Sequence, residues 1–127
     1  MVAPTATISG LALATLALHV RDPHVQNSWG FCPSAALGFY CPGCGGLRAV
    51  NDMTHGDVGA ALSSNLLLVA LMPVVVVALG VWFVRRWRGS QRDPDARLIV
   101  RATVAFCAVA IGFAVVRNLE VGAWLAP

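Results

Sequence analysis

Three long apolar stretches, separated by two polar segments, dominate the hydrophobic pattern of this chain. They cover residues 4–20, 58–84 and 98–116. A helix needs about 17–25 apolar residues to cross the hydrocarbon core of a membrane, and the first stretch is at the lower limit of this range. The pattern therefore predicts an all-α membrane protein, with a single membrane domain over residues 1–127 and about three transmembrane helices.

The composition supports a membrane environment. Hydrophobic residues make up 57% of the chain and charged residues only 12%, whereas a soluble domain carries about 25% charged residues. A soluble protein of 127 residues could not bury this much apolar surface. The nine basic residues are all arginine and are not interleaved with aromatic residues, so we expect lipid rather than nucleic acid as a partner.

The distribution of arginine predicts an orientation. Six of the nine arginines lie close together, from the end of the second apolar stretch to the start of the third: Arg85, Arg86, Arg88, Arg92, Arg97 and Arg101. Because cytoplasmic loops are enriched in arginine and lysine, the hinge at 85–97 and the N-terminus should be cytoplasmic. The loop at 21–57 should then lie outside, in a multi-pass protein of the cell (inner) membrane. The first stretch lacks a basic n-region, which favours a retained anchor over a cleaved signal peptide.

The predicted outer loop contains three of the four cysteines: Cys32, Cys41 and Cys44. From residue 44 to residue 54 we expect a short interfacial helix. Gly56 suits the position after the end of this helix, and Asp57 suits the N-cap of the second span.

The cysteines are compatible with three kinds of site. A structural disulfide is favoured because thiols outside the cytoplasm tend to oxidise, and its connectivity is left open. A zinc site formed by Cys32, Cys41, Cys44 and His55 is less favoured. A redox-active dithiol at Cys41 and Cys44 is the least favoured, although the start of a helix stabilises a thiolate. We predict no resident cofactor.

Other polar residues near the loop have simple structural explanations. Arg48 lies four residues after Cys44 and either faces its thiolate or is an ordinary interfacial residue. His55 and Asp57 are expected to end and begin helices, so no catalytic residue is predicted. We expect Asn65 to hydrogen-bond to a neighbouring helix and Cys107 to act as a packing residue. His19 and His24 have no evident partner in the sequence and are expected to be solvated or interfacial.

The run Cys41-Pro42-Gly43-Cys44-Gly45, followed by Arg48-Ala49, His55-Gly56-Asp57 and Asn65, carries a family resemblance. It resembles the Cys-Pro-x-Cys-Gly-x-x-Arg-Ala motif of a bacterial family of small membrane proteins of unknown function. The resemblance covers residues 31–66 and implies that these residues form one motif. Leu66 replaces a usual proline, which predicts a straighter start to the second span.

The resemblance also implies a function class. It extends to actinobacterial accessory proteins, and the arginine-, alanine- and valine-rich composition suits that source. The expected function is that of a non-catalytic accessory or assembly subunit that packs against larger membrane subunits. The implied complex is the cytochrome bcc–cytochrome c oxidase respiratory supercomplex. The alternative is an extracytoplasmic thiol-redox or metal-handling membrane protein.

Overall fold

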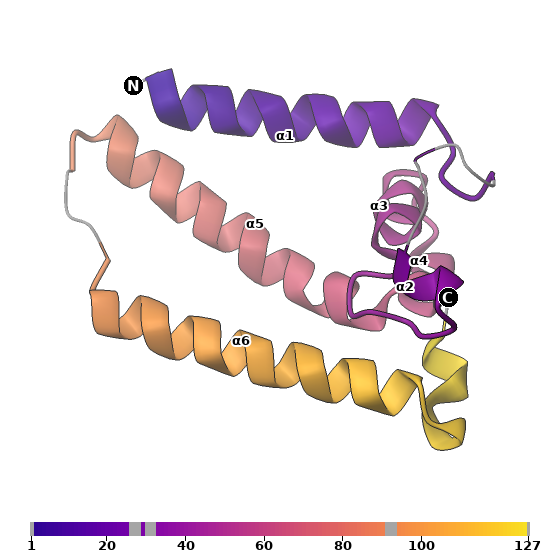
Figure 1. Ribbon diagram of the computed structural model, residues 1–127. Coiled ribbons are helices and arrows are strands. Elements are labelled where there is room, and N and C mark those ends of the chain that lie inside the picture. Colours follow the sequence, from indigo (N-terminus) through magenta and orange to yellow (C-terminus); the bar gives the residue numbers. More distant parts are fainter. Residues whose placement is uncertain (1, 26–28, 30–32, 91–93, 127) are drawn as a thin grey trace.

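The computed structural model describes residues 2–25, 29, 33–90 and 94–126, and within these residues the chain is helical with no strand. The elements are α1 (Val2–Val20), α2 (Pro33–Ala36), α3 (Gly46–Thr54), α4 (Val58–Ser64), α5 (Leu66–Trp87), α6 (Ala96–Arg117) and the 3-10 helix η1 (Glu120–Leu125) (Figure 1). The predicted all-α class is confirmed.

Three of the described helices are long and apolar enough to cross a membrane: Ala3–Val20 of α1, Leu66–Trp87 and Ala96–Arg117. At 1.5 Å per residue, the 22 residues of α5 or α6 extend about 33 Å, close to the thickness of the hydrocarbon core. The expectation of a multi-pass membrane protein is therefore confirmed.

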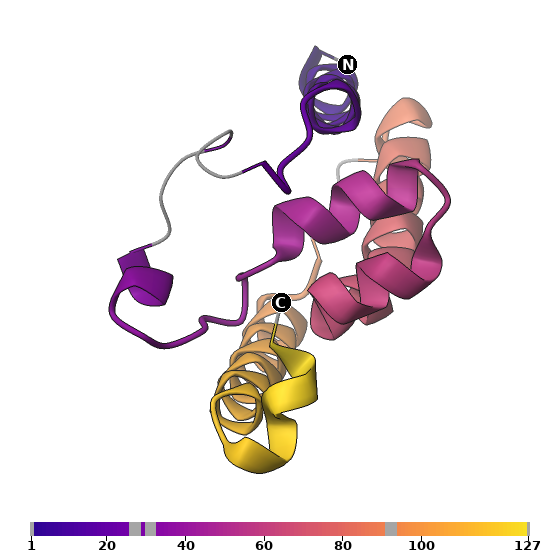
Figure 2. The ribbon, with the colours of Figure 1, turned by 90° about the vertical axis from the view of Figure 1, so that its right-hand side faces the viewer.

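The short helices gather at one end of the long helices. In Figure 1 the N-terminus and the α5–α6 connection lie at one end, and α3, α4 and η1 lie at the other. Viewed along the long helices, α3 and α4 lie across that second end (Figure 2). No residue of α5 is buried, and α6 buries only Ala110 and Arg117. The core of the chain is thus a polar cap, which we define as residues 40–65 together with 117–126.

The second predicted span, residues 58–84, is interrupted. Asn65 is extended, with φ −160° and ψ 94°, and separates α4 from α5. Its side chain accepts a hydrogen bond from the backbone N–H of Leu68 at 2.9 Å and so caps α5. The prediction of a straight start, based on Leu66, is wrong because asparagine starts a new helix here without the help of proline.

The predicted helix ends around α3 are largely confirmed. The helix begins at Gly46, two residues later than expected, after Gly45 with φ +79°. Gly56 also has φ +79°, a backbone conformation that glycine adopts without strain. The Asp57 carboxylate accepts from the Ala60 N–H at 2.9 Å and caps α4 as predicted.

The segment after α6 folds back against the end of that helix, whereas the sequence indicated only a short apolar tail. Gly122 is buried in η1, and the position of a Cβ atom there would collide with the carbonyl of Val116. Only glycine therefore allows η1 to pack this closely.

Gly122→Ala is expected to displace η1 and to destabilise the polar cap by about 1–3 kcal/mol, because an added methyl group must push the backbone apart. The measurement is the thermal unfolding midpoint in mild detergent. Gly10→Ala, at a site where nothing lies within 4 Å of the new Cβ, is the matched control. Equal midpoints for the two variants would contradict the close packing of Gly122.

Candidate functional site: the cysteine turn

Residues 41–44 form a tight turn, which we call the cysteine turn. The backbone N–H of Cys44 donates to the Cys41 carbonyl at 3.0 Å, and the N–H of Gly46 donates to the Gly43 carbonyl at 2.9 Å. The turn brings the Cys41 and Cys44 sulfur atoms to 3.1 Å from each other. Cys44 is buried and Cys41 is half-buried.

Asn65 attaches the cysteine turn to the start of α5. This side chain is fully buried. Its amide nitrogen donates to the Pro42 carbonyl at 2.9 Å and to the Cys44 carbonyl at 3.0 Å, while its oxygen caps α5. The sequence predicted a hydrogen bond to a neighbouring helix, but the partners are carbonyl groups of the loop. The amide nitrogen therefore holds the turn, and the amide oxygen holds the start of α5.

Arg117, the last residue of α6, attaches the turn to the C-terminal segment. Its exposed fraction is 1%. One terminal nitrogen donates to the carbonyls of Cys41 and Cys44, at 3.0 and 3.2 Å, and the other donates to the Leu125 carbonyl at 3.0 Å. The guanidinium also lies 5.0 Å from the Phe113 ring centroid and 5.7 Å from that of Tyr40.

Arg117 was not among the candidate site residues predicted from the sequence. The sequence signal was a single arginine at the end of an apolar stretch, and this signal is equally typical of an interfacial residue. Its buried Nε has no hydrogen-bond partner among the described residues. The result is a positive charge held at the backbone of both cysteines.

The first of the predicted cysteine sites is a structural disulfide. A disulfide requires a sulfur–sulfur distance of about 2.05 Å, so Cys41 and Cys44 are in contact but are not bonded. Cys32 lies outside the described residues, and disulfides that involve it stay predictions.

The zinc set is not assembled by the described residues, among which no group of three metal-ligating side chains occurs. His55 lies away from the cysteine turn, where its ring stacks on that of His19 with a centroid distance of 4.2 Å. Its Nδ1 lies 2.8 Å from the Asn51 carbonyl and donates to it.

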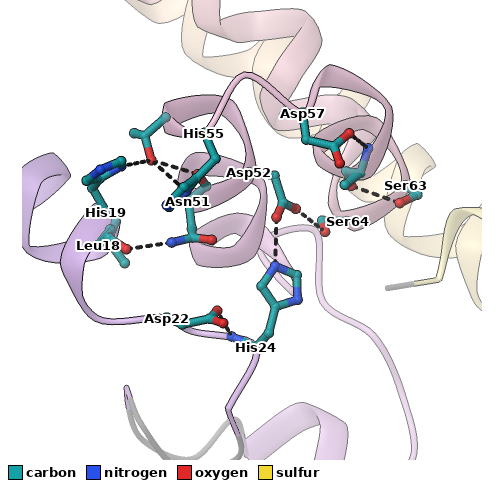
Figure 3. Close-up of polar contacts among 12 residues, drawn as sticks. Leu18, His19, Asp22, His24, Asn51, Asp52, His55, Asp57, Ser63 and Ser64 are labelled. Carbon is teal, nitrogen blue, oxygen red and sulfur yellow. Dashed lines mark hydrogen bonds and ion pairs between the residues drawn. The ribbon is translucent and has the colours of Figure 1, made fainter.

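His19 and His24 take part in the junction between α1 and α3 (Figure 3). Both are exposed, in agreement with the prediction, but each has a hydrogen-bond partner that the sequence did not indicate. His19 Nδ1 lies 3.0 Å from the Thr54 hydroxyl. His24 Nε2 lies 2.7 Å from a carboxylate oxygen of Asp52. Both partners lie on α3, far from these histidines in the sequence, so neither pairing has a local signal.

Two further hydrogen bonds complete this junction (Figure 3). The Asn51 side-chain amide donates to the Leu18 carbonyl at 2.7 Å, and the Ser64 hydroxyl donates to Asp52 at 2.9 Å. Asn51, Asp52 and Ser64 are all buried. They give α1, α3 and α4 a fixed arrangement.

Arg48 is half-buried on α3. Its side chain has no hydrogen bond or ion pair with any described residue. Among the described residues, the charge that contacts the backbone of the cysteine turn is that of Arg117, so the alternative in which Arg48 faces the turn is not supported.

An apolar groove of about 640 Å³ lies between residues 39–42 and the C-terminal half of α6. Both Cys41 and Cys107 line it. Residues 39–42 form one wall of the groove, and we call them the groove wall. Asn118 attaches this wall to α6, because its side chain accepts from the Tyr40 N–H at 2.8 Å and donates to the Tyr40 carbonyl at 2.7 Å. Cys107 therefore faces a groove instead of packing against a second helix, which corrects its predicted role.

The comparisons with known proteins match this part of the chain. Residues 32–79 match the model of a family described as "Protein of unknown function (DUF2752)". The match includes the cysteine turn, α3, α4 and Asn65, and excludes Arg117. No curated protein and no solved structure matches the chain. The family supplies no reaction, so function must be argued from the geometry.

Proposed function

We propose that this protein is a non-catalytic accessory or assembly subunit of a larger membrane complex. The observation that carries the proposal is the uncovered surface of the long helices. α5 buries none of its residues, and α6 buries only two. Helices within a membrane protein associate by close packing, and such packing is absent along most of these two helices.

Small residues on these helices support the proposal. A Cβ atom added at Gly80 or at Gly112 would have no neighbour within 4 Å. Small residues of this kind let a second helix approach closely. The polar cap holds one end of each helix, so the helices are prepared for a partner that packs between or beside them.

The proposed partners are the larger subunits of a respiratory complex, and the family resemblance makes the actinobacterial cytochrome bcc–cytochrome c oxidase supercomplex the specific candidate. The proposed orientation has the arginine hinge in the cytoplasm and the polar cap outside, in the cell membrane. In a Ser90→Cys variant, peptide mapping that finds residue 90 labelled by a membrane-impermeant maleimide in intact cells would contradict this orientation.

Mild-detergent purification through a tag on this chain tests the partner proposal. We expect larger membrane subunits with haem absorbance to copurify in constant ratio. Gly80→Leu and Gly112→Leu should reduce their recovery, whereas the volume-conserving Ile111→Leu should not. Recovery of the tagged chain alone, at normal expression, would overturn the proposal.

A second function is favoured by a specific observation at the cysteine turn. Two sulfur atoms 3.1 Å apart lie just before the start of α3, and the guanidinium of Arg117 binds the carbonyls of both cysteines. A helix N-terminus and a positive charge both stabilise a thiolate. We propose that Cys41 and Cys44 form a reversible dithiol–disulfide pair, which is the thiol-redox alternative.

Incubation of the purified protein in glutathione buffers of graded redox potential tests this second function. Alkylation and peptide mapping should show Cys41 and Cys44 oxidising together, with a single midpoint that shifts in Arg117→Met. The exposed arginine variant Arg101→Met should keep the original midpoint. Thiols that stay reduced throughout, or a bound zinc ion that protects them, would overturn the proposal.

A further inference from the structure

The apolar groove is next to the cysteine turn, and Cys41 belongs to both. We propose that this groove binds a quinone and that the Cys41–Cys44 dithiol reduces it. The inference rests on the second proposed function, because it requires that the two cysteines exchange electrons.

The groove has the size and lining of a site for a lipophilic molecule. Its volume of about 640 Å³ lies within the range of roughly 300–1,000 Å³ for small-molecule sites. Apart from the Asn118 and Tyr40 side chains, the lining groups are apolar side chains such as Phe106 and Ile111. Because α6 is one of the three candidate spans, the groove opens along a helix that contacts lipid, and a membrane-soluble ligand can enter it from the side.

The groove wall is held in place before any ligand arrives. Asn118 makes two hydrogen bonds with the backbone of Tyr40, and Arg117 binds the carbonyl of Cys41. Residues 39–42 are thus attached to α6 at consecutive positions. A preformed wall reduces the ordering cost of binding.

The position of the two sulfur atoms selects a quinone from among lipophilic molecules. Cys41 faces the groove, and Cys44 lies behind it, buried, at 3.1 Å. An acyl chain in the groove would offer the thiol no electron acceptor. A quinone ring beside Cys41 accepts two electrons and two protons, which is what a dithiol releases when it forms a disulfide.

The chemical step balances with these groups alone. The Cys41 thiolate adds to a ring carbon and forms a carbon–sulfur bond. The Cys44 sulfur then attacks the Cys41 sulfur, so the sulfur–sulfur bond forms and the carbon–sulfur bond breaks. The bonding electron pair stays with the ring, and the two thiol protons end on its oxygens. The products are one disulfide and one quinol.

The test uses the full-length protein, reduced and freed of reductant in vesicles, with decylubiquinone as the probe. We expect quinol absorbance to appear at one equivalent per pair of Cys41 and Cys44 thiols lost. Cys41→Ser and Cys44→Ser should each abolish this reaction. Ala114→Phe fills the groove and should slow it about tenfold or more, because inserted bulk excludes the ligand.

Ala108→Phe is the matched control, since Ala108 is exposed on α6 and does not line the groove. It should react at the wild-type rate. Equal rates for Ala114→Phe and the wild type, with both variants folded by circular dichroism, would overturn the groove as the quinone site. A disulfide that forms with oxidised glutathione but not with the quinone would overturn this inference and leave the dithiol function standing. A failure with both oxidants would overturn both.

Discussion

Arg117→Met is expected to lower the free energy of unfolding of the polar cap by about 3 kcal/mol. The substitution leaves the buried Leu125 carbonyl without a partner, which costs about 1–3 kcal/mol, and the Cys41 carbonyl keeps only its bond from the Cys44 N–H. The cost of burying the arginine charge is removed at the same time, which offsets part of this loss.

Cys44 provides the measurement for this prediction, because its exposed fraction is only 8% in the folded protein. Its rate of maleimide alkylation in mild detergent reports the opening of the polar cap, and should rise by roughly two orders of magnitude for a loss of about 3 kcal/mol. Arg101→Met removes an exposed charge from the same helix and should change the rate little.

Arg117→Lys tests whether the shape of the guanidinium contributes to stability in addition to its charge. A lysine keeps the charge but lacks the planar fork of the guanidinium. Its single ammonium nitrogen can donate to the cysteine carbonyls or to the Leu125 carbonyl, but it cannot replace both terminal nitrogens of the guanidinium. We therefore expect an intermediate alkylation rate. A wild-type rate for Arg117→Lys would show that charge alone, without the fork, holds the cap together.

Asn65→Ala is expected to destabilise the polar cap by about 2–4 kcal/mol. Loss of an asparagine N-cap costs about 1 kcal/mol. The Pro42 carbonyl also loses its amide donor, at a further cost of about 1–3 kcal/mol. Thermal unfolding in detergent and Cys44 alkylation should both report the change. Ser63→Ala, an exposed site on α4, should stay close to the wild type.

Asn65→Asp separates the two roles of this residue. Aspartate keeps the oxygen that caps α5 but replaces the donor with a carboxylate oxygen beside the carbonyls of Pro42 and Cys44. If attachment of the cysteine turn is the larger contribution, Asn65→Asp should be at least as destabilised as Asn65→Ala. A near-wild-type Asn65→Asp would instead show that Asn65 acts mainly as a helix cap.

The sequence allowed prediction of those features that depend on neighbouring residues. Long apolar stretches predicted the three spans, and the Gly56–Asp57 pair predicted where α3 ends and α4 begins. These signals are local, since a cap residue contacts a backbone group only three positions away. The interruption at Asn65 was missed because the short polar run Ser63-Ser64-Asn65 was taken as part of one span, and serine and asparagine also occur inside membrane helices, where they hydrogen-bond to neighbouring helices.

The contacts that complete the candidate site could not be predicted in the same way. Arg117 reaches carbonyl groups 76 and 73 residues earlier in the chain. A backbone carbonyl has no sequence signature, because every residue provides one. The charge at the end of α6 therefore indicated membrane topology, and only the fold shows that it binds the cysteine turn. The same reason applies to His24 and Asp52, which are 28 residues apart.

The position of Arg117 in the chain has a consequence for biosynthesis. Ribosomes add about 5–20 residues per second, so the cysteine turn emerges several seconds before the arginine that binds its carbonyls. During this interval Cys41 and Cys44 are available to oxidants and to metal ions without their final environment. The site can close only after α6 and η1 have been made. An assembled site is therefore found only in chains whose last helix has been translated and inserted.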